Sequence, residues 1–505
     1  MNLKLMLEET VRQYGDKTAI VSGDRRLTYA ELDEASNKVA NTLLSMGLNK
    51  GDRVAMLLSN SPEFVSVYFG TVKAGGIAVP LDIKYKVDEL ACLFGNCQPK
   101  VMVAESPILE PLVPTLPRFT SLKHVIGVGA KSEGQFLSYQ EIMATGSSNR
   151  VEVGLEPEDI AQISYTGGPT NRPRGAVLSH RSLVAEAAVS GDGFQQTDKD
   201  IVMLFALPMY HVFGLVAVLL TSVYKGSTVV MVSGTGLSIG IFMATIEREK
   251  GTMFLGVPYI FVLAVDMAEK GGVKNDLSSL RLCGSAGAPI SVDTIRRFKQ
   301  HYGFDLIDFW GLTEAVCHVT CPPADGTGKL GSVGKALPGW KVKIVDGDGK
   351  ELPPNQPGEI IVSGPIMKGY YDNRQATTEM IKDGWLHTGD IGRVDEDGWL
   401  FIVGRKKEVI IAKGQNIYPS DIEDVLYTHP KVAEAAVVGI PDELRGEVVR
   451  AVISLKAGQA ATEEEIRRFC RKRMADFKVP RQVIFMDSLT KTASGQIHKE
   501  GLKGW

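Results

Sequence analysis

Short runs of apolar residues alternate with longer segments of helical periodicity in the first part of the chain. The runs at 54–58, 77–80, 101–104 and 124–128 are bounded by polar or turn residues, as is typical of strands. Thr28, followed three residues later by a glutamate, has the pattern of a capping box that starts a helix. This alternation predicts βαβ units and a mostly parallel sheet.

The same rhythm returns further along the chain. Apolar runs at 201–206, 227–231, 253–257 and 280–283 predict strands, and 291–300 has the periodicity of a helix. Two α/β halves are the simplest arrangement that accommodates both sets of strands.

After residue 331 the pattern changes to short strands separated by turns. The segments 346–350, 353–359 and 395–398 are rich in Asp, Gly, Pro and Asn, the residues of hairpin turns. They predict a smaller β-rich subdomain.

Beyond residue 408 the pattern gives strands and helices in a unit of about 100 residues, a size that folds alone. Helices are predicted at 420–428 and 462–474, and strands at 433–438 and 448–455. The predicted fold class is α/β: a large N-terminal domain with two α/β sheet subdomains and a β-rich subdomain, then a small α+β C-terminal domain.

Length and composition support a multidomain globular protein. The 505 residues exceed a single compact core, and 44% hydrophobic with 23% charged residues is ordinary for such proteins. A net charge of −3 gives no overall field that would attract nucleic acid. The longest apolar runs, 212–220 and 253–265, are shorter than the roughly 20 residues of a membrane span, and the N-terminus lacks a signal-peptide pattern.

The cysteines favour a cytoplasmic location. Six are scattered along the chain without a CxxC pair, so we expect free thiols in a reducing compartment. Cys317, His318 and Cys321 lie close together, but they lack the usual zinc spacing and a second ligand pair, so no metal site is predicted there.

A polar, glycine-bearing loop at 164–175 follows one predicted strand. Such loops present backbone N–H groups and hydroxyls to phosphate, and the absence of GxxxxGK[ST] disfavours a P-loop kinase. An ordinary surface turn is an equally good interpretation of this loop taken alone. The candidate phosphate contacts are Thr166, Gly167, Gly168, Thr170 and Arg174.

The segment 309–314, Phe-Trp-Gly-Leu-Thr-Glu, is a second candidate. The ring of Trp310 can stack on a base, Thr313 can bond a phosphate oxygen, and Glu314 can hold Mg²⁺, which prefers carboxylate oxygen. A strand end followed by a helix cap is the alternative interpretation.

These loops, with Gly-Ser-Ala-Gly-Ala-Pro at 284–289 and the long motif at 384–423, occur in the order and spacing of one superfamily. From about residue 27 to 495 the chain resembles the acyl-CoA synthetases of the adenylate-forming superfamily, which also contains firefly luciferase and peptide-synthetase adenylation domains. The resemblance implies an N-terminal domain (1–404) that binds ATP and the acyl group, a hinge (405–408) and a mobile C-terminal domain (409–505).

The resemblance also implies nucleotide contacts. Gly287, Ala288 and Pro289 would line the adenine, and Trp310, followed by Gly311, would stack on it. Two further residues, Asp390 and Arg405, would hold the ribose hydroxyls, and Lys407 matches the hinge position.

The implied reaction has two steps. A carboxylate attacks the α-phosphate of ATP with Mg²⁺, releasing pyrophosphate, and the CoA thiol then attacks the acyl-adenylate after the C-terminal domain rotates; both steps depend on positioning and charge neutralisation. His211 would lie beside the carboxylate, with a buried structural histidine as the alternative. Lys413 and Gly414 would lie near the pantetheine path.

Two departures from the family pattern matter. The phosphate loop has Gly167, Pro169, Asn171 and Arg174 where the family usually has Ser, Thr, Gly and Lys. Pro169 has no backbone N–H to donate, and at Arg174 a planar guanidinium replaces the compact ammonium of lysine. Gln496 stands where the family has a catalytic lysine, and losing one such contact typically costs roughly 2.7–4 kcal/mol in the transition state.

Nearby lysines are the first candidates to replace the missing charge. They are Lys491 and Lys499, although surface lysines in a basic tail are the simpler interpretation of both. Without a substitute, adenylation is expected to be slow.

Three functions follow from these residues. The first is a fatty acyl-CoA synthetase, because the motif around 404–423 resembles the bacterial fatty-acid ligases, with a medium or long chain favoured by aliphatic walls at 212–216, 255–261 and 316–320. The second loads the acyl group onto a carrier-protein phosphopantetheine, and the third is a non-catalytic nucleotide or acyl-adenylate binder. Homodimers are common among such enzymes.

Overall fold

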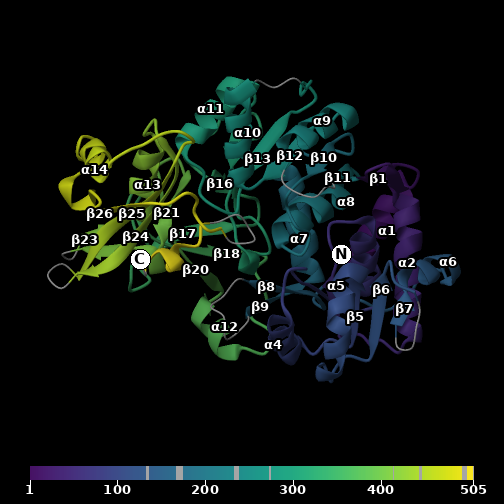
Figure 1. The fold of residues 1–505 in the computed structure, drawn as a ribbon. Helices are drawn as coiled ribbons and strands as arrows, with labels where there is room; N and C mark the ends of the chain where they lie inside the picture. Colours follow the sequence, from purple (N-terminus) through teal and green to yellow (C-terminus); the bar gives the residue numbers. More distant parts are fainter. Residues whose placement is uncertain are drawn as a thin grey trace.

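The described residues form five β-sheets, of which the two largest are wrapped by helices (Figure 1). The computed structural model describes residues 1–131, 136–166, 174–232, 238–271, 275–412, 415–442, 446–491 and 497–503. The α/β fold class predicted from the sequence is confirmed.

The first large sheet has seven strands in the order β7-β6-β5-β3-β4-β8-β9, all parallel except the antiparallel β8–β9 pair. The strands are β3 (Arg53–Leu57), β4 (Ile77–Pro80), β5 (Val101–Glu105), β6 (His124–Val128), β7 (Phe136–Ser138), β8 (Ile160–Thr166) and β9 (Arg174–Ser179). The helices around it are α2 (Tyr29–Ser45), α3 (Pro62–Lys73), α4 (Val87–Cys97), α5 (Ser106–Leu109), η1 (Glu110–Arg118) and α6 (Tyr139–Thr145). All four strands predicted in this region are present.

The second large sheet has the order β14-β13-β12-β10-β11-β1-β2 and is parallel except for the N-terminal β1–β2 hairpin. Its strands are β1 (Thr18–Ser22), β2 (Arg25–Thr28), β10 (Ile201–Leu204), β11 (Thr228–Met231), β12 (Met253–Gly256), β13 (Leu282–Ser285) and β14 (Leu306–Asp308). Its helices are α1 (Leu3–Tyr14), α7 (His180–Gly193), η2 (Phe213–Leu220), α8 (Thr221–Lys225), α9 (Ile239–Glu249), α10 (Pro258–Gly271) and α11 (Val292–Tyr302).

The β1–β2 hairpin was not predicted, because the partner of β1 is β11, some two hundred residues away in the chain. The capping box predicted at Thr28, directly after the hairpin, is confirmed. The Thr28 hydroxyl accepts from the Glu31 N–H, and the Glu31 carboxylate accepts from the Thr28 N–H. Local signals thus fixed the start of α2, while the hairpin depends on a distant strand.

The β-rich subdomain and the C-terminal unit follow, as predicted. The first contains an antiparallel sheet of β17 (Lys341–Val345), β18 (Gly358–Ser363), β19 (Ile381–Lys382), β20 (Trp385–Val394) and β21 (Leu400–Arg405), with β15 (Thr320–Cys321), β16 (Lys335–Ala336) and α12 (Arg374–Met380) nearby in the chain. The second contains β22 (Ile410–Ala412), β23 (Gln415–Ile417), β24 (Val432–Asp442), β25 (Gly446–Leu455), β26 (Gln482–Phe485), α13 (Pro419–Tyr427), α14 (Glu463–Arg471), η5 (Asp476–Lys478) and η6 (Lys499–Leu502).

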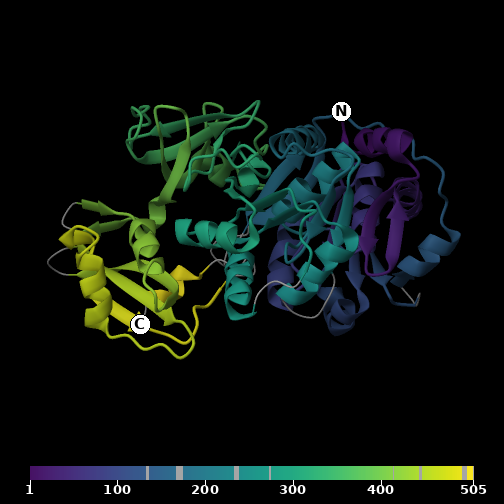
Figure 2. The same cartoon turned by 90° about the horizontal axis from the view of Figure 1, so that it is seen from above.

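The C-terminal unit lies at one end of the molecule, beside the teal part of the large domain that contains α10 and α11 (Figures 1 and 2). The sheet of the β-rich subdomain ends with β21 at Arg405, and the next sheet begins with β22 at Ile410. The short turn η4 (Lys406–Glu408) connects them. The predicted hinge at 405–408 therefore coincides with the chain segment between two sheets; its mobility stays a prediction.

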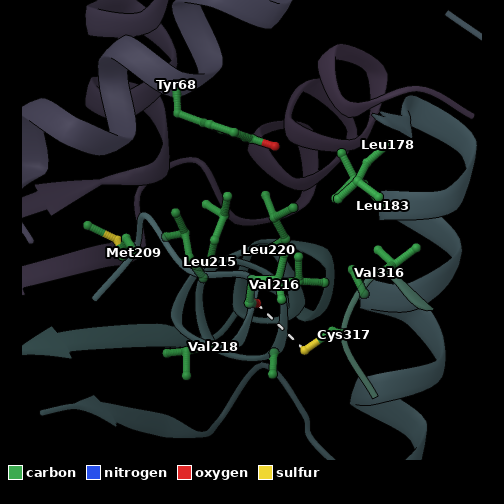
Figure 3. Packing of buried hydrophobic residues seen from close by; sticks show 14 of the residues in the cluster. Tyr68, Leu178, Leu183, Met209, Leu215, Val216, Val218, Leu220, Val316 and Cys317 are labelled. Atoms are coloured by element: carbon green, nitrogen blue, oxygen red, sulfur yellow. Dashed lines mark hydrogen bonds between the residues drawn. The ribbon is translucent and has the colours of Figure 1, made fainter. Parts of the chain in front are cut away.

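The apolar run at 212–220 forms a buried π-helix, η2. Leu215, Val216 and Leu220 of this helix are fully buried and pack below Tyr68 of α3 in the central core (Figure 3). In the part of the chain that the structure describes, no helix has the length and apolar content needed to cross a membrane.

Candidate active site

The candidate site lies where the carboxyl ends of the parallel strands of the second sheet meet. Gly256, Ser285 and Asp308 are neighbours in the register of β12, β13 and β14, so the loops that follow these strands start from the same edge. The predicted adenine loop follows β13 and the segment 309–314 follows β14. Ligands of open α/β sheets bind at such edges.

The segment 309–314 is fixed by backbone pairing and close packing. Trp310 forms an isolated bridge with Thr320, and the Val319 N–H donates to the Trp310 carbonyl at 2.9 Å. A Cβ atom at Gly311 would lie 2.0 Å from the Cys317 carbonyl oxygen, so only glycine allows the two backbone segments to approach. Gly311 therefore has a packing role in addition to its predicted place in the nucleotide site.

Glu314 is 8% exposed and is held by a residue that the sequence analysis missed. The hydroxyl of Tyr370 donates to Glu314 Oε1 at 2.6 Å, and the guanidinium of Arg174 lies over the Tyr370 ring, 5.5 Å from its centroid. The second carboxylate oxygen of Glu314 accepts no hydrogen bond from any residue that the structure describes. A buried carboxylate oxygen beside Thr313 suits a hard cation such as Mg²⁺.

Tyr370 reaches Glu314 because its segment pairs with β9. The Val177 N–H donates to the Gly369 carbonyl at 2.9 Å, and the Met367 N–H donates to the Glu314 carbonyl at 2.8 Å. The sequence signal was weak: an aromatic residue after glycine in a polar connection, with nothing to indicate its distant partner.

The chain turns sharply directly after Glu314. Val316 has a φ of +66°, and the Cys317 N–H donates to the Ala315 carbonyl at 2.7 Å, which closes a γ-turn. A β-branched residue in this backbone region is strained, and such strain concentrates at functional sites.

Asp390 connects the segment 309–314 to the end of β21 in the predicted nucleotide site. Trp310 Nε1 donates to Asp390 Oδ2 at 2.9 Å, and Arg405 Nε lies 3.4 Å from Asp390 Oδ1. Asp390 and Arg405 are directly opposite each other in the β20–β21 register. Burial raises the pKa of Asp390, and the nearby Arg405 charge and the Trp310 hydrogen bond oppose that shift.

Asp308, after Tyr370, is a second residue of this edge that the sequence analysis missed. Its half-buried side chain forms no hydrogen bond or ion pair with the residues that the structure describes, and burial raises its pKa well above the ordinary value. The adjacent adenine loop presents Gly287, at a φ of +85°, with Ala288 half-buried and Pro289 exposed. An unpaired carboxylate at the end of β14 is available to a ligand bound there.

His211 is an exposed residue between buried neighbours. Its side chain is solvent-accessible, its Nδ1 accepts from the Phe213 N–H at 3.2 Å, and its neighbours Met209 and Val212 are buried. The dense surroundings disfavour the charged form and lower the pKa of His211 to about 4, so the imidazole is neutral at pH 7. The alternative of a fully buried structural histidine is wrong for this accessible ring.

The predicted phosphate loop is only partly described. The Thr166 hydroxyl, at the end of β8, donates to the Arg174 carbonyl at 3.4 Å, so these residues close the base of the loop. The remaining predicted residues lie outside the described residues: Gly167, Gly168 and Thr170 of the phosphate loop, Lys413 and Gly414 of the pantetheine path, and Gln496.

The two candidate replacement lysines are not free surface groups. Lys499 pairs with Glu423 at 2.8 Å and with Glu408 at 3.3 Å; burial lowers its pKa, but these carboxylates raise it further, and the net shift is upward. Lys491 forms an ion pair with Glu434. Interpreting them as lysines of a basic surface tail was wrong. Lys407, at the predicted hinge, is exposed.

The cluster around His318 contains Glu186 rather than Cys321. His318 Nδ1 lies 3.2 Å from Glu186 Oε1, and Cys317 completes a buried group of three. The Glu186 carboxylate already accepts from the His318 backbone N–H at 2.9 Å and from Trp340 Nε1 at 3.3 Å. These bonds give the carboxylate a structural role.

Comparisons with known proteins agree with this geometry. Residues 7–371 match the family model described as AMP-binding enzyme, and residues 421–496 match the AMP-binding enzyme C-terminal domain. A long-chain-fatty-acid–CoA ligase of Bacillus subtilis is 33% identical over 535 residues, covering 99% of this chain and 94% of that protein. A feruloyl-CoA synthase of Amycolatopsis is 35% identical over 491 residues, covering 95% and 94%.

Solved structures are similar over the whole chain. The anthranilate CoA ligase AuaEII in complex with anthranoyl-AMP has a TM-score of 0.93 at 28% identity, covering 100% of this chain and 97% of that one. ATP-bound MatB from Rhodopseudomonas palustris has a TM-score of 0.91 at 30% identity, and apo MatB from the same organism has 0.82; each comparison covers 100% of this chain and 99% of that one. The chain belongs to the AMP-binding enzyme family of ATP-dependent, adenylate-forming acyl-CoA ligases.

Proposed function

We propose that this ligase activates a medium- or long-chain fatty acid and transfers the acyl group to CoA. The observation that carries the nucleotide part of the proposal is Asp390, which holds Trp310 and Arg405 together at the edge of the sheet. The Trp310 indole and the Arg405 guanidinium, both held by this carboxylate, are preorganised to receive the base and ribose of ATP.

Membership in the family supports the other proposed roles. Trp310 stacks on the adenine, lined on its other side by Gly287, Ala288 and Pro289, and a carboxyl oxygen of Asp308 accepts a hydrogen bond from the base. Thr313 bonds a phosphate oxygen, as do Thr166, Gly167, Gly168, Thr170 and Arg174 of the phosphate loop.

Glu314 is the residue that would hold Mg²⁺. The ion supplies charge neutralisation at the phosphates, and Tyr370 keeps the carboxylate in one orientation through its 2.6 Å hydrogen bond. Fixing this carboxylate in advance reduces the rearrangement needed when the metal and nucleotide bind.

Neutral His211 faces the acyl carboxylate in this proposal. An uncharged imidazole can donate a hydrogen bond to the carboxylate without pairing with it so strongly that attack on the α-phosphate is retarded. Lys413 and Gly414 border the path of the pantetheine after the C-terminal domain rotates about 405–408, with Lys407 at the pivot.

The fatty-acid substrate is supported by the aliphatic character of the segments that would form the acyl pocket. Val212, Val216 and Val316 are buried aliphatic side chains from two of these segments. The relatives include both a long-chain-fatty-acid ligase and a feruloyl-CoA synthase, so an acid panel is needed to choose between aliphatic and aromatic acids. A carrier-protein phosphopantetheine is the alternative acceptor.

We place the enzyme in the cytoplasm, because all six cysteines are free thiols, five of them buried. Homodimerisation, common among such enzymes, is the proposed assembly. Gel filtration with light scattering measures it directly.

Acid-dependent ATP–pyrophosphate exchange tests the function. The panel should include acetate, octanoate, palmitate, benzoate and ferulate, each with the wild-type protein and with Gln496→Lys. Exchange that is strongest with octanoate or palmitate supports the proposal. Product formation with free CoA, compared with a phosphopantetheinylated carrier protein, identifies the acceptor.

Nucleotide binding without exchange for any acid, in both proteins, would contradict the synthetase proposal. That result would favour the non-catalytic binder, for which the altered phosphate loop and Gln496 are the motivating residues. Calorimetry with ATP measures this binding independently of turnover.

A further inference from the structure

A contact between the two domains lies beside the segment that departs from the family pattern. The Lys491 ammonium of the C-terminal domain is 3.8 Å from the centroid of the Tyr259 ring, which belongs to α10 of the large domain. Glu434 of β24 pairs with the same ammonium. A cation held over an aromatic face while its charge is balanced by a carboxylate is a favourable arrangement.

The position of Lys491 is fixed from its own domain. Lys491 forms an isolated antiparallel bridge with Ile497, and the His498 N–H donates to the Thr490 carbonyl at 2.8 Å. Glu434 also accepts from the Leu489 N–H at 3.4 Å. These bonds close the two ends of the segment that contains position 496, so the location of Lys491 sets where the base of that segment lies.

The partner surface is set by the large domain. Tyr259 follows Pro258 at the start of α10 and packs, half-buried, on the core beneath that helix. Farther along α10, hydrogen bonds from Arg297 lower the pKa of Glu269, and the charge of Lys456 in the C-terminal domain adds to this shift. The contact of Lys491 with Tyr259 thus joins the start of α10 to the C-terminal domain, which lies beside this helix in the two views of the fold (Figures 1 and 2).

Any rotation about 405–408 must change this contact, because Tyr259 and Lys491 lie on opposite sides of the segment between the domains. The present arrangement is similar to ATP-bound MatB at a TM-score of 0.91 and less similar to apo MatB at 0.82. The contact therefore belongs to an arrangement like that of a nucleotide-bound relative.

We infer that Lys491, Tyr259 and Glu434 form a latch that holds the C-terminal domain in the adenylation arrangement, with Lys491 as a positioning residue. The inference rests on the proposed function, since the latch acts on its first half-reaction. It also assigns Lys491 a use other than direct replacement of the missing lysine: its ammonium is committed to Tyr259 and Glu434.

Domain arrangement can be measured without turnover. Cys92 is the exposed thiol among six free cysteines, and the other five are buried, so Cys92 and an introduced Lys472→Cys on the C-terminal surface accept a pair of spin labels selectively. The distance distribution with bound ATP gives the ratio of the two arrangements. Lys491→Gln and Tyr259→Leu should each lower the closed fraction relative to the open one by roughly three- to thirtyfold, the range for a cation–π contact.

Matched variants distinguish loss of the latch from a nonspecific effect of substitution on the structure. Lys491→Arg keeps a stacking cation and Tyr259→Phe keeps the ring, so both should retain the wild-type distribution. Arg468→Gln, which removes an exposed charge from α14 of the same domain, should also have no effect. The double variant Lys491→Gln/Tyr259→Leu should lose little more than either single variant, because both remove one interaction.

Kinetics supply the second readout. Lys491→Gln should slow pyrophosphate exchange in proportion to the lost closed fraction and leave thioester formation from a supplied acyl-adenylate unchanged or faster. An unchanged distance distribution in Lys491→Gln would overturn the latch, as would an equal shift in Lys491→Arg or additive effects in the double variant. A shift in distances with no exchange in the wild type would instead contradict the proposed function and leave the latch standing.

Discussion

The nucleotide edge and the C-terminal segment 489–499 are built in different ways. At the edge, Asp390, Trp310 and Arg405 are brought together by sheet register and backbone bridges within the large domain and the β-rich subdomain. In the C-terminal segment, Lys491 and Lys499 depend on carboxylates and on a ring across the domain boundary. The proposed nucleotide site therefore belongs to one continuous scaffold, whereas the proposed adenylation contact would depend on where the C-terminal domain lies against the large domain.

The largest expected effect comes from restoring charge in the C-terminal segment. Gln496→Lys should raise acid-dependent pyrophosphate exchange by roughly 10²–10³, because it returns one donor to the developing charge of the transition state. ATP affinity should change little, since the nucleotide edge is unaltered. Parallel measurement of exchange and of ATP binding checks both parts.

Gln496→Arg is the matched control. It should give a smaller gain in exchange, since a planar guanidinium replaces the compact ammonium of lysine. Equal exchange by the wild type and Gln496→Lys would contradict this prediction. It would mean that another cation already performs the adenylation-specific contact.

The next largest effect is at the nucleotide edge. Asp390→Ala should weaken ATP binding roughly ten- to hundredfold, because hydrogen bonds to a charged group are worth about 1.5–3 kcal/mol and two donors lose their acceptor. Asp390→Asn keeps an acceptor for Trp310 and should lose less. Isothermal calorimetry with ATP gives the ratio, and an unchanged dissociation constant for Asp390→Ala would contradict the proposed ribose site.

The sequence predicted the nucleotide edge better than the C-terminal segment 489–499. The strands before and after the edge were predictable from local pattern, and Asp390, Arg405 and Trp310 were named through a family motif. The register that places Asp390 opposite Arg405 was not predicted. Tyr370 and Asp308 were not, because their importance comes from burial and from a partner far away in sequence. The interpretation of Lys491 and Lys499 failed for the same reason: the carboxylates that bind them are supplied by other elements.

The ionisation of Glu186 should make the stability of the large domain depend on pH without changing the domain arrangement. Burial raises the pKa of Glu186 to about 8 from its ordinary value of 4.5, so the folded protein retains a proton that the unfolded chain releases. Its contribution to stability is complete below about pH 4.5 and is lost as the pH rises through 8. Glu186→Gln cannot ionise, and its stability relative to wild type should rise by at most about 1.4 kcal/mol per pH unit in this window.

Thermal unfolding of both proteins in matched buffers from pH 5 to 8.5 gives this difference. Burial holds the pKa of the neighbouring His318 at about 3, so it stays neutral throughout the window and cancels from the comparison. A melting-temperature difference that is flat with pH would show that Glu186 is already ionised in the folded protein. The spin-label distances between domains should not follow this titration, because Glu186 lies within the core of the large domain.

The smallest expected effect concerns Tyr370, which lies between the two regions compared. Tyr370→Phe removes the hydroxyl that donates to Glu314 and leaves the ring beneath Arg174, so the fold and the phosphate-loop base should be preserved. One hydrogen bond is worth about 1 kcal/mol, which predicts a rise of about fivefold in the Mg²⁺ concentration needed for half-maximal exchange. Because the loss is confined to the orientation of one carboxylate, saturating Mg²⁺ should restore the rate. A fall in rate that Mg²⁺ does not restore would instead place Tyr370 in direct contact with the reacting groups and extend the rigid nucleotide edge toward the acyl site.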